Sequence, residues 1–102
     1  MRLLVLFDLP TATKQDRKNY MQFRKFLISD GYDMLQFSVY SRIAKNRDDI
    51  DMHVYRLKNS LPPKGQVRAL AVTEKQYAQM IVLLGTLTVS EEKLADRELL
   101  VL

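Results

Sequence analysis

The chain has 102 residues, of which 47% are hydrophobic and 27% are charged, and it contains no cysteine. This composition predicts one globular domain and is compatible with a reducing compartment, and it excludes a disulfide framework, a thiolate zinc site and a disordered chain. The 16 lysines and arginines outnumber the 12 aspartates and glutamates, and the net charge of +4 weakly favours a polyanionic partner.

The N-terminal segment from Arg2 to Asp8 is predicted to be a buried strand. Its apolar run, Leu3 to Phe7, is too short for a typical helix or a membrane span, and Pro10 turns the chain after it. No small-residue cleavage site follows the run. We therefore expect a cytoplasmic protein without a membrane partner, in which Asp8 lies at the exit of a buried strand.

Two helices are predicted from apolar residues at helical spacing. The first spans Lys14 to Asp30, with Thr13 as its N-cap and Gly31 after its end. The second spans Arg47 to Asn59, with Asn46 as its N-cap, and two prolines prevent its continuation.

Three further strands are predicted in the rest of the chain. Residues 34–40 alternate between apolar and polar side chains, and residues 67–73 and 80–84 are rich in apolar residues and end at turn signals. A helical turn at 74–79 separates the last two. This order matches a ferredoxin-like βαββαβ sandwich of the α+β class, although its second and third helical segments depart from the regular repeat.

The predicted ferredoxin-like domain covers residues 1–85, and residues 86–102 form a C-terminal extension. The extension ends in the apolar segment Glu98 to Leu102, which we expect to be a strand that pairs with a sheet edge of the same chain or of a partner.

The predicted sheet needs a cover on its second face. Helices cover only one face of such a sheet, yet the strands at 2–8 and 80–84 are apolar on both sides. The simplest cover is a second copy of the chain, related by a two-fold axis. The sequence therefore predicts a homodimer.

Asp8 is the candidate for chemistry, and two interpretations of it stay open. An aspartate before Leu-Pro is a good turn initiator. Alternatively, Asp8 binds Mg²⁺, which proteins hold with one or two carboxylates and phosphate oxygens, and the two-fold axis supplies a second Asp8. His53 is the only histidine, and we expect a packing or surface role for it and not a catalytic one. The sequence contains no Gly-rich phosphate loop.

Basic residues of the first predicted helix form a candidate nucleic-acid-binding stripe within an arc of roughly 120°. Either the stripe binds phosphates or it is an ordinary solvated helix face. A second basic cluster lies in the loop after the strand at 34–40 and could extend the stripe. The stripe contains Lys14, Arg17, Lys18, Arg24 and Lys25, and the second cluster contains Arg42, Lys45 and Arg47.

Four motifs occur in a fixed order along the chain: Phe-Asp-Leu-Pro at 7–10, Phe-Arg-Lys-Phe-Leu at 23–27, Gln-Phe-Ser-Val-Tyr at 36–40 and Thr-Glu-Lys-Gln at 73–76. Together they resemble the CRISPR-associated protein two family, and the first and last resemble members found beside type II systems. The resemblance implies a ferredoxin-like homodimer with facing sheets, in which the C-terminal strand of each chain adds to the sheet of its partner.

The resemblance also implies two roles. Asp8 matches an aspartate linked to Mg²⁺ or Mn²⁺ and to endonuclease activity on RNA or DNA, although Phe7 stands where a tyrosine often precedes that aspartate. In spacer acquisition, the dimer bridges dimers of CRISPR-associated protein one, the integrase, and carries duplex prespacer DNA on its basic helices. Fold analogy alone adds a third alternative, a small-molecule sensor.

Overall fold

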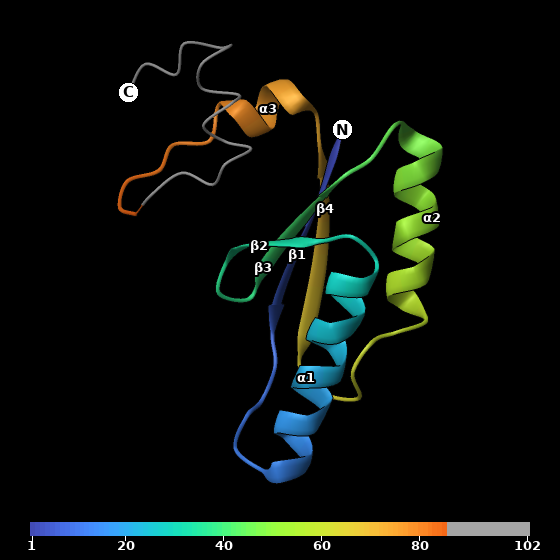
Figure 1. Ribbon diagram of the computed structural model, residues 1–102, viewed down its shortest axis with the longest axis vertical. Coiled ribbons are helices and arrows are strands. Elements are labelled where there is room, and N and C mark those ends of the chain that lie inside the picture. The colour runs from blue at the N-terminus through green and yellow to red at the C-terminus, as the bar shows by residue number, and fades with distance from the viewer. Residues whose placement is uncertain (86–102) are drawn as a thin grey trace.

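Residues 1–85 are described by a computed structural model, and they form a four-stranded sheet and three helices (Figure 1). Neighbouring strands are antiparallel, in the order β2-β3-β1-β4. The first six elements follow one another as βαββαβ, which confirms the predicted ferredoxin-like fold. In chain order, the elements are β1 (Arg2–Asp8), α1 (Lys14–Ser29), β2 (Asp33–Gln36), β3 (Val39–Ile43), α2 (Arg47–Lys58), β4 (Gln66–Val72) and α3 (Glu74–Ala78).

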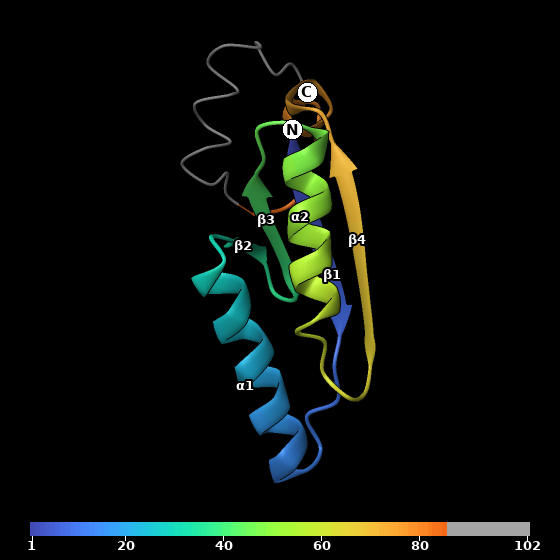
Figure 2. The same ribbon diagram turned by 90° about the vertical axis from the view of Figure 1, so that its right-hand side faces the viewer.

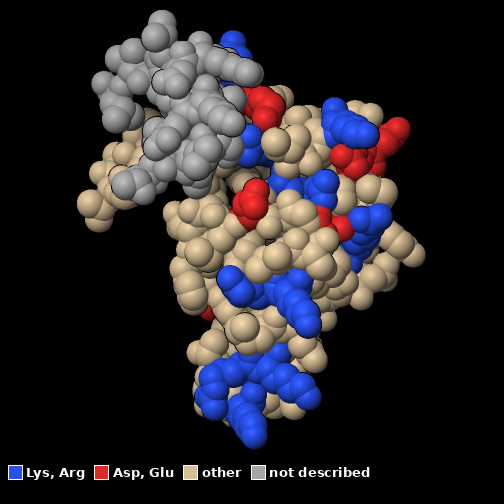
Figure 3. Space-filling model, in the orientation of Figure 1, with Lys and Arg blue, Asp and Glu red and all other residues tan. Residues whose placement is uncertain are grey.

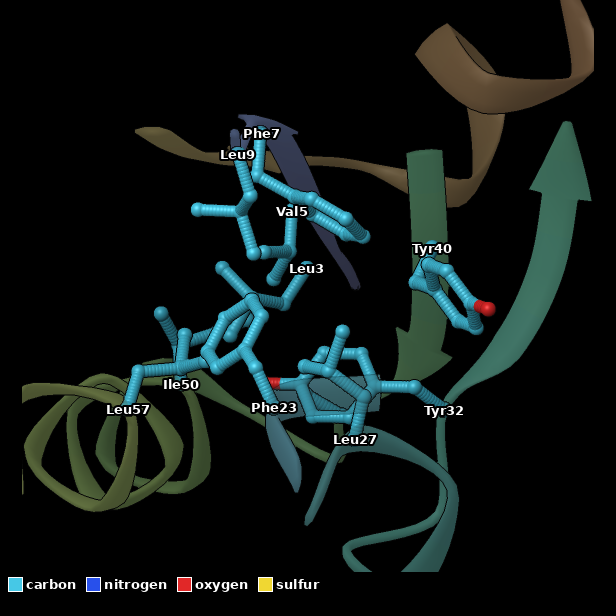
Figure 4. Close-up of a cluster of buried hydrophobic side chains, with 11 residues drawn as sticks. Leu3, Val5, Phe7, Leu9, Phe23, Leu27, Tyr32, Tyr40, Ile50 and Leu57 are labelled. Carbon is cyan, nitrogen blue, oxygen red and sulfur yellow. The ribbon is translucent and has the colours of Figure 1, made fainter. Parts of the chain in front are cut away.

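The core lies between the sheet and the two long helices, α1 and α2, which occupy the same side of the sheet (Figure 2). Alternate residues of β1, namely Leu3, Val5 and Phe7, are buried and point into this layer (Figure 4). Burial of each such side chain stabilises the fold by about 1.5–3 kcal/mol. The same cluster includes Phe23 and Leu27 of α1 and Ile50 and Leu57 of α2.

Local caps begin both long helices where the sequence predicts. The Thr13 hydroxyl accepts a hydrogen bond from the Asp16 backbone N–H at 3.0 Å, and the Asp16 carboxylate accepts one from the Thr13 N–H at 3.2 Å. In α2, Asn46 Oδ1 accepts a hydrogen bond from the Asp49 N–H at 2.9 Å. Because these caps satisfy N–H groups that the first helical turn leaves unpaired, they fix where each helix starts.

The single strand predicted at 34–40 is wrong, because this segment folds as a hairpin. Strand β2 ends at Gln36, β3 begins at Val39, and a two-residue turn joins them. Ser38 in this turn has a φ of 63°, and the register of the two strands shifts between Met34 and Gln36. The turn lacks the glycine, proline or asparagine that usually signals a hairpin, so the polar–apolar alternation concealed it.

The strand predicted at 80–84 is also wrong. The chain continues after α3 without helix or strand through residue 85, and Ile81, Leu83 and Leu84 are exposed. Strand β1 already pairs with β3 on one side and β4 on the other, so the hairpin supplies the strand that the prediction lacked. The predicted extension at 86–102 lies outside the described residues.

The face of the sheet opposite α1 and α2 carries exposed apolar side chains. Leu6 of β1 is 40% exposed, Ile43 of β3 is 59% exposed and Leu70 of β4 is 54% exposed. Ile43 pairs with Arg2 and Leu70 pairs with Leu4, so all of these residues share the face of the even-numbered residues of β1. We call this surface the open face.

No helix within residues 1–85 has both the length and the apolar character that a membrane crossing requires.

Candidate nucleic-acid interface

Asp8 lies exposed at the end of β1, where it pairs with Gln66 of β4. Gly65 precedes that partner, and a Cβ atom built on it would lie 2.5 Å from the Asp8 carbonyl oxygen. The Phe7 ring is buried in the core against Phe23 and Tyr40. Because consecutive strand residues point to opposite faces, a hydroxyl on this ring would extend into the helix layer and away from the Asp8 side chain.

A single protomer offers a metal ion little beyond Asp8. Among residues 1–85, no group of three or more histidine, aspartate or glutamate side chains is arranged to hold a metal ion. A hard cation at Asp8 would therefore have one carboxylate ligand from this chain and would depend on water, phosphate oxygens or a second Asp8 for the rest. The side chains present fit a shared or substrate-assisted metal site, and they do not form a complete one.

Helix α1 carries five basic residues and a single acidic residue, Asp16. Asp16 is 7% exposed and is engaged in the helix cap, so the outer surface of α1 presents cations without an exposed carboxylate. Figure 3 shows lysine and arginine side chains gathered at the end of the molecule where Figure 1 places the start of α1. We call this surface the α1 basic face, and its members are Lys14, Arg17, Lys18, Arg24 and Lys25.

Two arginines of the α1 basic face are held by hydrogen bonds. Arg17 Nη1 donates to the backbone carbonyls of Thr11 and Ala12, each at 3.2 Å. Arg24 Nε donates to the Tyr40 hydroxyl at 3.0 Å, which ties α1 to β3. These contacts orient both guanidinium groups.

The structure also brings three cations of this face to one hollow. Lys18, Arg24 and Lys25 border a shallow hollow of about 360 Å³ on α1, together with the exposed apolar side chains of Met21 and Ile28. The hollow therefore combines positive charge with apolar surface.

The second predicted basic cluster is divided between the C-terminal end of α1, where Arg42 lies, and the start of α2. Arg42 donates to the backbone carbonyls of Asp30 and Ile43 and lies over the Tyr32 ring, 5.9 Å from its centroid. Arg47 pairs with Asp51 at 3.6 Å. Lys45 and Arg47 lie at the start of α2, at the opposite end of the molecule from the start of α1 (Figure 1).

His53 belongs to a buried polar network that ties α1 to α2. Its Nδ1 lies 2.9 Å from Asp30 and its Nε2 lies 3.3 Å from Asp49. Asp30 also pairs with Arg56 at 2.7 Å. The backbone N–H of Lys45 donates to Asp49 and, as the main cause, holds the pKa of that carboxyl below its ordinary value. This network fastens the end of α1 to α2, in agreement with a packing role for His53.

Sequence reasoning missed an exposed aromatic residue beside α1. Phe37, in the β2–β3 turn, is 76% exposed, and its ring stacks on Tyr20 of α1 with a centroid distance of 6.2 Å and an interplanar angle of 20°. The alternation of residues 34–40 had placed Phe37 on the apolar side of a strand. The turn itself carries no sequence signal, so the exposure of Phe37 could not be predicted from the pattern of residues 34–40.

Comparison with known proteins decides the family. A family model described as CRISPR associated protein Cas2 matches residues 1–80, which include every helix and strand described above. The chain belongs to the Cas2 family. The resemblance inferred from the motifs is thereby confirmed.

Similar proteins agree with this assignment over most of the chain. A protein from Acidovorax ebreus named CRISPR-associated endoribonuclease Cas2 is 53% identical over 93 residues, which are 91% of this chain and 91% of that protein. A protein of the same name from Streptococcus mutans is 49% identical over 85 residues, which are 83% of this chain and 78% of that protein.

A solved structure supports the fold. The crystal structure of Streptococcus pyogenes Cas2 at pH 6.5 superposes with a TM-score of 0.61 and 21% identity, and the alignment covers 81% of this chain and 99% of that chain. At this level of identity, the similarity concerns the fold alone.

Proposed function

We propose that this protein binds nucleic acid through phosphate contacts as a homodimer, and that it serves CRISPR spacer acquisition by bridging dimers of CRISPR-associated protein one, the integrase. The α1 basic face carries this proposal, because its five cations stand on a helix whose only carboxylate is buried in a cap. Membership of the Cas2 family supports the CRISPR context.

The chemistry of the α1 basic face predicts how it would bind. Exposed lysines and arginines on the outside of a helix neutralise phosphates, and phosphate contacts position a nucleic acid without reading its bases. We therefore expect an affinity for duplex DNA that is insensitive to sequence and that falls steeply as salt rises.

Two duplexes of unrelated sequence test this expectation by fluorescence anisotropy over a series of salt concentrations. We expect equal affinities for the two duplexes, and a slope of log K against log salt that decreases in magnitude by about 0.9 for each phosphate contact removed. The test variant combines Arg17→Gln and Lys18→Gln. The control combines Lys58→Gln and Lys75→Gln, which remove two exposed cations from α2 and α3.

Two results would overturn the DNA-binding proposal. One is an affinity that does not change with salt. The other is a control variant that loses as much affinity as the α1 variant, because net charge alone would then explain the binding.

The open face supports the homodimer. Exposed Leu6, Ile43 and Leu70 lie on one side of the sheet, and a second copy would bury the same apolar surface on both chains. Leu70→Glu is expected to give a monomer by light scattering, whereas Tyr55→Glu, on the outside of α2, keeps the dimer. A Leu70→Glu variant that remains dimeric would place the interface elsewhere.

The bridging role is tested separately. Mixing the dimer with the integrase should give a complex with two integrase dimers.

A second candidate function is metal-dependent endonuclease activity at Asp8. Two similar proteins with 53% and 49% identity carry the name endoribonuclease, and Asp8 is an exposed carboxylate at the end of a central strand. Mg²⁺ or Mn²⁺ would be held by Asp8 together with the Asp8 of a second copy. When bound, such a cation activates water and stabilises charge on a phosphate. The chain itself would contribute the carboxylate and hold the phosphodiester on its basic residues.

Cleavage of single-stranded RNA tests the second candidate. Asp8→Asn should abolish cleavage and leave DNA binding within about twofold, and EDTA should have the same effect on the wild type. Asp33→Asn removes another exposed carboxylate and is the matched control. Equal cleavage by wild type and Asp8→Asn would show that Asp8 is not the catalytic residue.

A further inference from the structure

An exposed aromatic ring is held in a fixed position next to the Asp8 end of β1. Phe37 is 76% exposed, although its ring stacks on Tyr20. The next residue, Ser38, accepts a hydrogen bond through its carbonyl from the Phe7 N–H at 3.1 Å. The Tyr20 ring in turn contacts the Phe7 ring edge to face, at a centroid distance of 6.0 Å. Phe37 is thus held by Tyr20 through ring stacking and, through the neighbouring Ser38, by Phe7 near the end of β1.

Two arginines of α1 stand before and after Tyr20, the residue whose ring supports Phe37. On α1, Arg17 lies three residues before Tyr20 and Arg24 lies four residues after it, so both arginines are within one helical turn of the ring that supports Phe37. Hydrogen bonds to the backbone of the 11–12 segment and to Tyr40 hold the two guanidinium groups. Within residues 1–85, Arg24 uses Nε for its one hydrogen bond, which leaves its two terminal amino groups for another acceptor.

This combination of a preordered aromatic ring and flanking cations suits a single strand of nucleic acid. A base of any identity presents a flat aromatic surface that stacks on a ring, and cations along the same path hold the phosphates. A duplex keeps its bases paired and stacked on one another, so it cannot use an isolated ring in this way. The two parts of the surface therefore select an unpaired nucleotide.

We propose that Phe37 is a stacking site for an unpaired base, with Arg17 and Arg24 holding the phosphates on either side of that nucleotide. The proposal rests on the nucleic-acid binding proposed above and adds that a single-stranded segment of RNA or DNA has its own subsite. The ring of Phe37 rests on a residue of the helix layer, so the subsite is assigned to the α1 side of the molecule.

The full-length protein is tested with single strands of about 12 nucleotides, within the usual site size, that carry 2-aminopurine at one position. Stacking quenches 2-aminopurine fluorescence, so the wild type should quench it and Phe37→Ser should not. Phe37→Ser should lose affinity for the single strand about tenfold. Its affinity for duplex DNA, and for a single strand with an abasic site in place of the reporter, should change less than about twofold. Separate DNA and RNA probes show which strand is preferred.

Two further variants complete the experiment. Phe37→Trp restores an aromatic surface and should recover both quenching and affinity. Tyr55→Ser removes an aromatic residue that is 68% exposed on α2, and it should bind as the wild type does.

Each contrary outcome has a distinct meaning. An unchanged affinity of Phe37→Ser for the single strand would overturn the stacking site, even if salt-dependent duplex binding is normal. A loss on duplex, abasic and base-containing probes alike would also overturn it. A Phe37→Ser variant that becomes monomeric would assign Phe37 to the dimer interface. Salt-insensitive binding of duplex by the wild type would overturn the proposed function itself.

Discussion

The guanidinium group of Arg2 lies over the ring of Tyr77, with its central carbon 4.3 Å from the ring centroid. Arg2 Nε also donates to both carboxylate oxygens of Glu74 at 3.1 Å, and the Arg2 side chain is only 7% exposed. Both partners belong to α3, which follows β4 in the chain. A single buried cation therefore fastens α3 to the first residue of β1.

Glu74→Gln should lower the free energy of unfolding by about 1–2 kcal/mol, because the buried guanidinium loses a charged acceptor that is itself partly exposed. Urea denaturation measures the change. Lys75→Gln, which alters one exposed charge on the same helix, is the control and should leave stability nearly unchanged. An equal loss in both variants would show that the Arg2–Glu74 pair does not stabilise the fold.

The same chemical change at two buried tyrosines should have opposite effects. Among the described residues, the buried Tyr32 hydroxyl has no hydrogen-bond partner, and burial raises its pKa well above the ordinary value. Tyr32→Phe should therefore raise the free energy of unfolding by about 1 kcal/mol. Tyr40→Phe should lower it by about 1 kcal/mol, because the Tyr40 hydroxyl accepts a hydrogen bond from Arg24. Thermal or urea denaturation of both variants decides the matter, and the prediction fails if the two changes have the same sign.

Acid should destabilise the fold partly through Asp49. The hydrogen bond from the Lys45 N–H holds the pKa of the Asp49 carboxyl below its ordinary value of 3.8. The folded state therefore binds the proton less readily than the unfolded state. The stability that Asp49 contributes is complete well above the unfolded-state pKa, and it is lost as the pH falls through the lower folded-state value.

Urea denaturation of Asp49→Asn from about pH 5 to about pH 2 checks this prediction. The variant should lose less stability over this range than the wild type does. Asp48→Asn, at the exposed neighbouring position, should follow the wild type. A wild-type profile in Asp49→Asn would contradict the assignment.

Gly65 should be less replaceable than Gly85. Both have positive φ, at +100° and +116°, where a side chain is strained. At Gly65 an added Cβ would also meet the Asp8 carbonyl oxygen at 2.5 Å and the Leu9 side chain at 2.8 Å, whereas at Gly85 no atom of the described residues 1–85 lies within 4 Å. Gly65→Ala should lower the free energy of unfolding by more than about 2 kcal/mol, and by more than Gly85→Ala does. Equal losses of unfolding free energy in the two variants would mean that the backbone at the end of β1 can move to accommodate a Cβ at residue 65.

Local signals predicted the helices correctly, whereas long-range pairing decided the strands. Thr13 and Asn46 cap helices whose apolar residues lie nearby in the sequence, so a short window contains the whole signal. Residues 80–84 have the composition of a strand. They form none within the sheet, whose two central positions are taken by β1 and β3, and β1 is paired on both sides by strands that lie far apart in the chain.

In the candidate site too, local signals predicted some residues, whereas contacts between separate elements could not be predicted. Asp8 and the cations of α1 were predicted because strand ends and polar helix faces expose their side chains. The sequence does not reveal that Arg42 is engaged by the Asp30 carbonyl, or that Phe37 stacks on Tyr20, because each contact joins separate elements. Which predicted cations share a surface is thus a property of the folded chain.

The central position of β1 also sets the order in which the chain can fold as it is synthesised. Strand β1 leaves the ribosome first, yet its ladder with β4 pairs Arg2 with Val72 and cannot close until residue 72 has emerged. Helix α1 and the β2–β3 hairpin need only local contacts and can form earlier. The apolar run of β1 therefore waits longest for its partners, and unpaired apolar strands are prone to aggregation. The arrival of β4 is the step that ends this exposure.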